Sequence, residues 1–540
     1  MPPTARGMIH NAEKSPNTAR RPPKAKRPNA ILAMVSGLSI VILPHKIDGS
    51  GGTAMPWIAL TVWLACGADP VPWPDDWEDQ VDRAVERARA FWRVPGTVVA
   101  ITDGEKIRYL KAHGMADAAA RRRMDPGAVF PLASCTKAFT TLLAARLADR
   151  GLLSWDDPLT RHLPWFRVGG NSGYRPITLG DAASHSSGYD SHDLLWYRRK
   201  ESMRARVERL AGLAPEAPPG QRFRYQTTVY TTVGLAVEAA GKAPWPVQAR
   251  EGILKPLSLE STWMDPSEVP PARIPMGYQL DAEFIPRPVE PYPWNGPDPT
   301  ASAHANAADL CRWLRFHMGD GLSSGSRLVS AAAMAELHKP RVPQKLTDEV
   351  KIHHPFTRRM AYGLGWLAFD HRGDALLAHA GAIDGFRVQM TLLPDRKLGI
   401  VVFANLELTR LNLALTNTII DEVLGHPFRD YNGPYLRLQE KQALESLEQT
   451  RQELAKVAGV AAPPGPAEGT FSHPAYGDAV LSREGEAWKL AIGPNSAPLV
   501  RQGPACWVAP GLTFGNAIVR LEGADTLRIG GRVEASFTRK

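Results

Sequence analysis

Apolar residues recur three or four positions apart in two stretches of the chain, residues 75–94 and 130–151. In the first stretch they are Trp77, Val81, Val85 and Ala88. In the second they are Phe139, Leu142, Leu143 and Leu147. This spacing follows the period of an α-helix with one buried face. We therefore predict an amphipathic helix in each stretch, the second one stopped by Gly151.

Alternation of apolar and polar residues predicts β-strands on both sides of a long helical region. Residues 95–114 contain two alternating runs around Asp103-Gly104, a residue pair typical of hairpin turns. Several further strand-like runs, separated by turn residues, lie between Tyr362 and Glu407. Short helical pieces and proline-rich segments occupy the chain between these two sets of strands. Because the helices lie between N-terminal and C-terminal strands of one sheet, we predict a mixed α/β (α+β) body.

The character of the chain changes in its last fifth. Residues 435–459 are polar and predict a helix, and the breaker-rich segment AAPPGPAEG follows them. From Gly469 onward short alternating runs are separated by turns, which predicts a small all-β, barrel-like domain. We divide the chain into four parts, residues 1–70, 71–432, 433–466 and 467–540.

Composition and charge exclude several classes of function. The 540 residues are 44% hydrophobic and 22% charged, which is ordinary for a soluble globular protein. The formal net charge is +9, but residues 1–28 alone carry +6, so the remaining 512 residues carry only +3. A nucleic-acid partner is therefore not predicted. The four cysteines form no C-x-x-C pair and no metal-ligand spacing appears, so we predict no disulfide framework and no metal. No organic cofactor is implied either.

The first 70 residues are typical of a targeting segment. A basic run precedes 14 apolar residues, Ala30–Leu43, as in a secretory signal or a short anchor. A membrane-spanning helix needs about 20 such residues. A second apolar run ends at Cys66 and resembles a lipoprotein cleavage site, except that Trp63 stands where such sites usually carry leucine. We predict an exported protein of bacterial type, periplasmic or attached to a membrane through its N-terminus, with Cys66 as the candidate lipidation site. A later translation start is the alternative.

A serine and a lysine stand one helical turn apart at the head of the second predicted helix, in FPLASCTKAF. Ser134 and Lys137 occupy positions i and i+3 and share one face of a helix. Burial would lower the pKa of the ammonium group, which would make the lysine a base for the hydroxyl. The helix N-terminus would stabilise a developing oxyanion. A serine at a helix start is also a common N-cap, and the pattern alone leaves both interpretations open.

A rival nucleophile motif occurs later in the chain. The stretch GLSSG, residues 321–325, satisfies G-x-S-x-G, the nucleophile elbow of α/β-hydrolases. That elbow needs an apolar strand before it and a helix after it. Here RFHMGD precedes the motif and SRLVS follows it, so we interpret the stretch as a surface turn.

Four stretches of the chain carry motifs in a distinctive order. They are FPLASCTKAFTTLLAARLADRG (130–151), ITLGDAASHSSGY (177–189), PPGQRFRYQTTVYTTVGLAVEAAG (218–241) and AHAGAIDGF (378–386). Together they resemble the S-x-x-K helix, the H-x-S-G loop, the Y-x-N segment and an H-x-G variant of the K-T-G strand of the serine β-lactamase and penicillin-binding-protein-like hydrolases. The branch of class C β-lactamases, esterases and D-aminopeptidases is the most similar.

This resemblance extends from Trp77 to Gly425 and implies an antiparallel sheet flanked by helices, with an all-helical subdomain. In the C-terminal part, GTFSHPAYGD (469–478) resembles a small lipocalin-like module appended to many of these hydrolases.

The resemblance also implies roles for individual residues. Ser134 would be the nucleophile, Lys137 its activating partner, and Tyr225 the phenol that passes the proton to the leaving group. A cation is needed to lower the pKa of such a phenol, and Lys137 would supply it. His379 would line the opposite wall of the cleft. The backbone N–H groups of Ser134 and Ala382 would form the oxyanion hole, and the expected substrate-binding residues are Thr227, Ala380 and Gly381.

Other residues in these stretches have plainer interpretations. Taken without the resemblance, Tyr225 and His379 are most simply packing residues. We interpret His185 as a residue of loop structure and Cys135 as a small packing residue.

Two departures from the family pattern shape the predicted function. Thr227 replaces the asparagine of Y-x-N, and H-A-G replaces K-T-G, so the site lacks the usual groups that bind a β-lactam carboxylate. We therefore predict a serine hydrolase that acts through an acyl-enzyme on small-molecule esters, amides or small peptides, similar to an esterase or a D-aminopeptidase. The alternatives are a weak β-lactamase or DD-peptidase-like penicillin-binding protein, and a non-catalytic homologue whose cleft only binds a ligand.

Overall fold

The computed structural model describes residues 73–540 except 171–172, 282, 320, 324–325, 456–466, 504, 511, 513–516 and 531–533. The described residues belong to one compact unit, Ala65–Lys540. The predicted signal, anchor and lipidation segments, Cys66 included, lie outside the described residues. Within the described part of the chain, no helix has both the length and the apolar character needed to cross a membrane.

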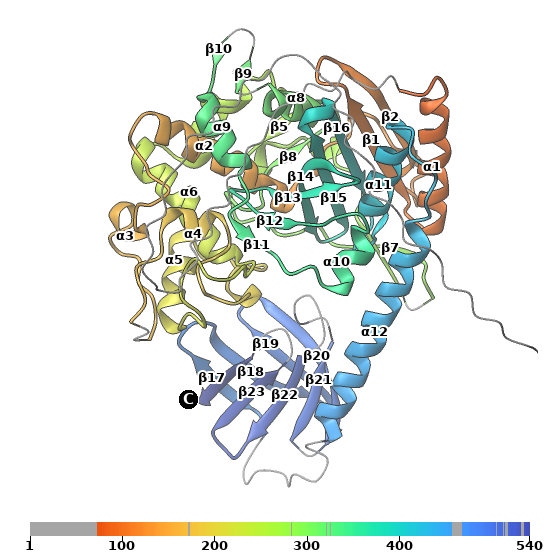
Figure 1. Cartoon of the computed structure of the whole chain (residues 1–540). Helices are drawn as coiled ribbons and strands as arrows, with labels where there is room; N and C mark the ends of the chain where they lie inside the picture. The colour runs from red at the N-terminus through yellow and green to blue at the C-terminus, as the bar shows by residue number, and fades with distance from the viewer. Residues whose placement is uncertain are drawn as a thin grey trace, which may run out of the picture. The chain divides into compact units, whose positions relative to one another are not determined.

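A nine-stranded sheet, antiparallel at every strand pair, forms the centre of the unit (Figure 1). Its strands, in spatial order, are β11 (Val342–Pro343), β12 (Met360–Tyr362), β13 (Leu367–His371), β14 (Asp374–Ile383), β15 (Phe386–Leu393), β16 (Leu398–Ala404), β1 (Gly96–Thr102), β2 (Ile107–Asp117) and β3 (Arg122–Arg123). The predicted hairpin at Asp103-Gly104 is the β1–β2 pair. In the β16–β1 pair, Thr97 lies opposite Ala404. The prediction that N-terminal and C-terminal strands share one sheet is therefore confirmed.

Strand β1 shows why both faces of the sheet need helices. All seven of its residues are buried, and alternate residues belong to different cores. Val99 and Ile101 pack with residues of α1 (Trp77–Phe91) and α11 (Leu411–Val423). Val98 and Ala100 belong to the core that holds α2 (Thr136–Asp149) and α8 (Ala307–Met318). Because both faces of β1 are covered, its residues do not alternate between apolar and polar as they would in a strand with one face exposed to solvent.

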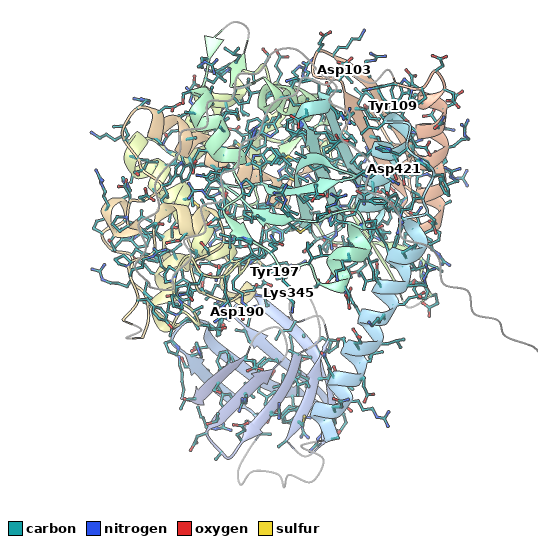
Figure 2. The ribbon with its side chains drawn as sticks, in the orientation of Figure 1. Asp103, Tyr109, Asp190, Tyr197, Lys345 and Asp421 are labelled. Atoms are coloured by element: carbon teal, nitrogen blue, oxygen red, sulfur yellow. The ribbon has the colours of Figure 1, made fainter. Side chains whose placement is uncertain are left out.

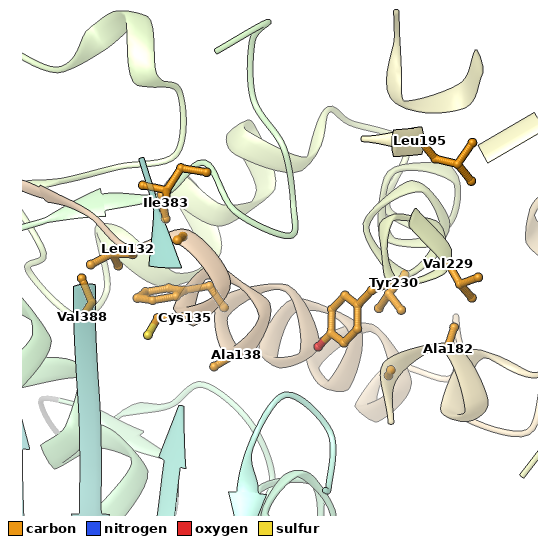
Figure 3. Close-up of a cluster of buried hydrophobic side chains, with 14 of the residues drawn as sticks. Leu132, Cys135, Ala138, Ala182, Leu195, Val229, Tyr230, Ile383 and Val388 are labelled. Carbon is orange, nitrogen blue, oxygen red and sulfur yellow. The ribbon is translucent and has the colours of Figure 1, made fainter. Parts of the chain in front are cut away.

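The helix α2 differs from the sequence prediction. It ends near Gly151 as predicted, but eleven of its fourteen residues are buried, so the expected polar face is missing. Figure 3 shows the reason: strand residues such as Ile383 and Val388 lie to one side of the helix, and Tyr230 and Ala182 of the helical subdomain lie to the other. The subdomain comprises α3 (Leu159–His162), α4 (Leu179–Ala183), α5 (Met203–Glu208), α6 (Thr227–Gly241) and α7 (Trp245–Ala249).

Smaller elements complete this part of the chain. The helices are α9 (Ala331–His338) and α10 (Asp348–His353), and the short strands are β4 (Phe130–Pro131), β5 (Thr262–Trp263), β6 (Tyr278–Leu280), β7 (Pro286–Pro288), β8 (His304–Ala305), β9 (Leu322–Ser323) and β10 (Ser326–Arg327). The serine of the GLSSG motif, Ser323, lies on β9 and pairs with Ser326 of β10. Because a second strand rather than a helix follows the first, the motif is not a nucleophile elbow.

The C-terminal part is a closed eight-stranded barrel, as predicted for an all-β domain. Its strands pair in chain order and β17 closes the barrel against β24; they are β17 (Gly469–His473), β18 (Gly477–Glu484), β19 (Ala487–Ile492), β20 (Asn495–Gly503), β21 (Cys506–Ala509), β22 (Ala517–Glu522), β23 (Thr526–Gly530) and β24 (Ala535–Arg539). Helix α12 (Asn432–Ala455) precedes it. The four-part division of the chain remains a prediction, because one compact unit spans its boundaries.

Candidate active site

Ser134 lies in a strained turn at the start of α2. The 3₁₀ turn η1 (Ala133–Cys135) leads into the helix, and Ala133 adopts a φ of 45°, which is unusual for a residue with a side chain. Ser134 is the single partly exposed residue between Ala128 and Ala145. The N-cap position of α2 belongs to Cys135, and no side chain caps the helix. The interpretation of Ser134 as an N-cap is therefore wrong, and its hydroxyl faces a solvent-accessible site.

Lys137 is fully buried beneath this hydroxyl. Its Nζ lies 3.1 Å from Ser134 Oγ and 3.1 Å from the carbonyl oxygen of Thr300. The same Nζ lies 5.0 Å from the ring centre of Tyr225 and 5.5 Å from that of Tyr230. The predicted proximity of serine and lysine is therefore present, and two aromatic rings and one carbonyl, none of them charged, complete the surroundings of the amine.

The electrostatics of this pocket favour a neutral amine. Burial lowers the pKa of Lys137 to about 7, although the negative charges of Asp298 and Asp193 act in the opposite direction. Asp298 accepts hydrogen bonds from Arg206 at 2.8 Å and from the hydroxyl of Thr300 at 2.6 Å, so its charge is already compensated. At neutral pH a large fraction of Lys137 is thus unprotonated and able to accept a proton.

Tyr225 is half-buried, and its hydroxyl interacts with the side chain of Ser134. Burial raises the pKa of this phenol above its usual value of 10, and the interaction with Ser134 offsets only part of the rise. The expectation that Lys137 would lower the pKa of Tyr225 is therefore wrong. Since burial also keeps Lys137 partly neutral, the lysine supplies little positive charge, and the phenol remains protonated at neutral pH.

The ring of His185 supports Tyr225 from the side. The two ring centres lie 3.9 Å apart, and His185 Nδ1 accepts a hydrogen bond of 3.1 Å from the backbone N–H of Gln226. Burial holds the pKa of His185 well below 6.5, so the imidazole is neutral. The loop carrying His185 thus fixes the segment that carries Tyr225. The next residue singled out by the sequence, Thr227, is buried and is the first residue of α6.

His379 lines the opposite wall and is engaged on both ring nitrogens. Because a carbonyl only accepts, Nδ1 carries a proton and donates it to the carbonyl oxygen of Ala380 at 2.8 Å. Nε2 then accepts from the hydroxyl of Tyr362, also at 2.8 Å. Burial lowers the pKa of His379 to about 3, so the ring is neutral. Sequence reasoning missed Tyr362, which carries no motif beyond the strand-like run in which it lies.

The edge of β14 forms the other side of the site. Strand β13 pairs with residues 374–378 only, so β14 extends beyond it and its remaining residues lie along η1. The thiol of Cys135 donates to the carbonyl oxygen of His379 at 3.3 Å. A Cβ on Gly381 would lie 2.1 Å from the carbonyl oxygen of Leu132, so only glycine permits this approach. The side chains of the two flanking residues, Ala380 and Ala382, are exposed.

The structure brings Ser134, Lys137 and Tyr225 together and places β14, with His379 and Gly381, beside the turn that carries Ser134. One side of the site consists of the Ser134–Lys137 turn with Tyr225, and the other is β14. In the described part of the chain, no group of three or more His, Cys, Asp or Glu side chains is arranged to hold a metal ion. The arrangement combines a hydroxyl, a partly neutral amine and a protonated phenol, groups that can support nucleophilic acyl transfer.

An antiparallel sheet whose strand β14 faces a Ser-x-x-Lys helix, with a tyrosine from a helical subdomain nearby, is typical of the serine β-lactamase and penicillin-binding-protein-like fold. The chain belongs to the Beta-lactamase family, whose model matches residues 81–424. Members of this family are generally serine hydrolases. The predicted resemblance is therefore confirmed.

Curated relatives cover part of the chain. The unguisins hydrolase ungD of Aspergillus violaceofuscus is 26% identical over 388 residues, which are 67% of this chain and 67% of that protein. Protein flp of Staphylococcus aureus is 26% identical over 344 residues, 62% of this chain and 64% of its own length. The chain thus spans about two thirds of the length of these relatives.

Solved structures extend the likeness of the fold. The octameric penicillin-binding protein homologue from Pyrococcus abyssi matches with a TM-score of 0.58 at 19% identity and covers 85% of this chain and 100% of its own. Residues 1–424 make up less than four fifths of the chain, so this likeness reaches into the C-terminal part. EstCE1, a hydrolase with promiscuous acyltransferase activity, matches with a TM-score of 0.55 at 21% identity, over 65% of this chain and 99% of its own.

Proposed function

We propose that the protein is a serine hydrolase that acts through an acyl-enzyme on small-molecule esters, amides or small peptides. The observation that carries the proposal is the distance of 3.1 Å between the partly exposed hydroxyl of Ser134 and the buried amine of Lys137, whose pKa is about 7. A hydroxyl beside a neutral amine is an activated nucleophile. The relative ungD and the structural neighbour EstCE1, both named as hydrolases, support the same class of reaction.

The reaction that these groups support has two stages. In the first, Lys137 accepts the proton of Ser134 while Oγ attacks the carbonyl carbon of the substrate. The backbone N–H groups of Ser134 and Ala382 stabilise the oxyanion. Tyr225 gives its proton to the leaving alcohol or amine and receives one from Lys137, so the acyl group remains on Ser134. In the second stage water attacks the ester carbon and the same groups return the protons.

The surroundings of His379 support esters and amides over β-lactams. A neutral imidazole with both nitrogens engaged provides no cation to bind a carboxylate, and Ala380 provides no hydroxyl. We therefore expect turnover of short acyl esters such as p-nitrophenyl acetate to exceed that of the chromogenic cephalosporin nitrocefin by at least about 100-fold in kcat/KM. Faster hydrolysis of nitrocefin would favour the alternative of a β-lactamase.

The experiment that tests the proposal is covalent labelling with a fluorophosphonate. Intact-mass spectrometry of the purified protein is expected to show one phosphonyl adduct, formed as Ser134 Oγ displaces fluoride. Ser134→Ala is expected to show none, whereas Ser323→Ala, which removes the serine of the rival GLSSG motif, is expected to label like the parent. A folded parent without an adduct would contradict the proposal and leave the cleft as a ligand-binding site.

A further inference from the structure

Two turns of the barrel contact the hydrolase part of the chain. In the turn between β17 and β18, Tyr476 is fully buried, and its hydroxyl forms a hydrogen bond of 2.8 Å with Nδ1 of His192. Burial lowers the pKa of His192 to about 4 and raises that of Tyr476, so this bond keeps one donor and one acceptor across neutral pH. Next to the turn between β19 and β20, the side-chain amide of Asn495, the first residue of β20, donates to the carbonyl oxygen of Tyr197 at 3.0 Å.

A buried arginine reinforces the same contact. Arg199 is 5% exposed; its Nε donates to the carbonyl oxygen of Leu194 at 2.7 Å and its Nη2 to that of Tyr476 at 2.8 Å. The barrel approaches closely at two glycines. A Cβ on Gly493 would lie 2.4 Å from the Arg199 guanidinium, and one on Gly212 would lie 2.7 Å from the backbone nitrogen of Ala475. We call residues 192–199 the bridging segment.

The bridging segment reaches the active-site strand on its other side. Tyr197, labelled in Figure 2, donates its hydroxyl to Asp384 Oδ1 at 2.7 Å. Arg198 donates from Nε to Asp384 Oδ2 at 3.2 Å, and its backbone N–H donates to the hydroxyl of Tyr292 at 2.9 Å. Arg198 has a φ of 56°, a strained backbone conformation. Its hydrogen bonds to Tyr292 and Asp384 help to hold it there.

Asp384 stands at the end of β14, directly beside the proposed oxyanion hole. It follows Ile383, the last residue of the strand, and lies two residues after Ala382. That end of the strand is not paired with β13. The position of the Ala382 N–H therefore depends on β15 along one edge of the strand and on the anchoring of Asp384 at its end.

We propose that the barrel positions the oxyanion strand through the bridging segment, with Tyr197, Arg198 and Asp384 as positioning residues. The barrel turns hold the segment by Tyr476 and Asn495, and the segment holds Asp384. This inference rests on the proposed function for its catalytic consequence. A displacement of about 1 Å at a hydrogen-bond donor is enough to lower the rate of acyl transfer substantially.

The test uses variants of the full chain and the second-order rate of fluorophosphonate labelling at Ser134. The double variant Tyr476→Phe/Asn495→Ala removes the two barrel bonds and is expected to lower the rate about fivefold; Asp384→Asn is expected to lower it about tenfold. Combining all three substitutions is expected to give no more than the effect of Asp384→Asn alone, because all act along one route. Effects that multiply would overturn the proposal.

A second readout does not depend on catalysis. Hydrogen exchange of the backbone amides of residues 381–384 is expected to accelerate in both variants. Arg528→Gln, which alters an exposed barrel residue paired with Glu522, is the matched control and is expected to exchange like the parent. Tyr197→Phe removes the hydrogen bond from Tyr197 to Asp384 and leaves the ion pair between Asp384 and Arg198 intact. This variant replaces Asp384→Asn in the test if Asp384→Asn fails to fold.

The two readouts separate two kinds of failure. If the parent does not label at all, the proposed function fails, and the exchange pattern still decides the positioning role. Unchanged exchange at residues 381–384 in the barrel variant would overturn that role whatever the labelling shows.

Discussion

Lys137 combines full burial with the lack of a carboxylate within ion-pair distance among the described residues. Its neighbours are a hydroxyl, a carbonyl oxygen and two aromatic rings. Desolvation therefore dominates, and the amine can accept a proton near neutral pH. The same burial that makes Lys137 a usable base also lowers the stability of the folded protein.

The pH dependence of acylation follows from this lysine. Because the reactive form of Lys137 is the neutral amine, the labelling rate is expected to rise about tenfold per pH unit below pH 7 and to level off above it. Asp193 raises the pKa of Lys137, so Asp193→Asn is expected to lower it and move the profile to lower pH. The measurement is the labelling rate from pH 5 to 9, with Glu486→Gln in the barrel as the control. A profile that moves to higher pH would contradict this assignment.

Replacing Lys137 by methionine should stabilise the fold. The pKa of lysine is near 10.4 in an unfolded chain and about 7 here, so between these values the unfolded state binds more protons. The stability of the parent thus falls as the pH drops from about 10 to 7 and stays low below pH 7. Each unit of difference corresponds to about 1.4 kcal/mol.

We expect Lys137→Met to be more stable than the parent by at least about 1 kcal/mol at pH 6.5, with a smaller margin at pH 9.5, in urea unfolding. The exposed Lys345, labelled in Figure 2, provides the control Lys345→Met, which is expected to show no such pH-dependent gain. A loss of stability at both pH values would show that the amine has a structural role.

Thr227 distinguishes a weak enzyme from a ligand-binding homologue. The residue is buried at the start of α6, and Lys137 already has Ser134 and Thr300 as hydrogen-bond partners. We expect Thr227→Asn to raise kcat/KM for p-nitrophenyl acetate by less than tenfold. A much larger gain would mean that the native site is degraded and that binding, rather than turnover, is its function.

Local spacing was sufficient to find part of this site. Ser134 and Lys137 are one helical turn apart, so their contact follows from the sequence once a helix is predicted. Tyr362 and the carbonyl of Thr300 come from elements more than 150 residues away, and no local pattern marks them. The pKa of Tyr225 could not be predicted for the same reason, since burial by distant segments decides it.

At the scale of elements, the close approach of η1 to β14 controls the geometry of the site. There is no room for a side chain at Gly381, because a Cβ there would lie 2.1 Å from the carbonyl oxygen of Leu132. Gly381→Ala must therefore move the strand or the turn. We expect it to lower fluorophosphonate labelling at least about 100-fold with the protein still folded by circular dichroism.

The neighbouring position provides a matched control for this change. Ala380 has an exposed side chain, so Ala380→Ser is expected to label within about twofold of the parent. If Gly381→Ala labels as fast as the parent, the reaction does not depend on the close approach of β14 to the turn that carries Ser134.

The sequence predicts an element well when one face of it packs against the protein, and less well when several faces are covered. The β1–β2 hairpin, the strands between residues 360 and 404 and the barrel have regular alternation or clear turns, and the sequence predicts them. Helix α2 was predicted to be amphipathic, yet the helical subdomain covers the side left for solvent. The docking of the barrel turns also has no periodic signal, because it depends on single residues such as Tyr476 and Asn495.

At the scale of the whole molecule, Arg199 links the barrel to the hydrolase part by binding carbonyl groups of both. Arg199→Ala would leave these carbonyls without the guanidinium and empty a buried volume. We expect calorimetry to show a lower transition temperature and a separate barrel transition that the parent does not show. Arg528→Gln is the control, and an unchanged single transition in Arg199→Ala would contradict this linkage.

The ribosome synthesises β1 long before its partner β16. Thr97 lies opposite Ala404, so β1 waits for β16 until about 300 further residues have been synthesised. At ~5–20 residues per second, this interval lasts roughly 15–60 s. Throughout it the β1–β2 hairpin presents an open strand edge with apolar faces, a form that other chains can bind. The nascent protein therefore depends on early protection, and the synthesis of β16 is the event that ends this need.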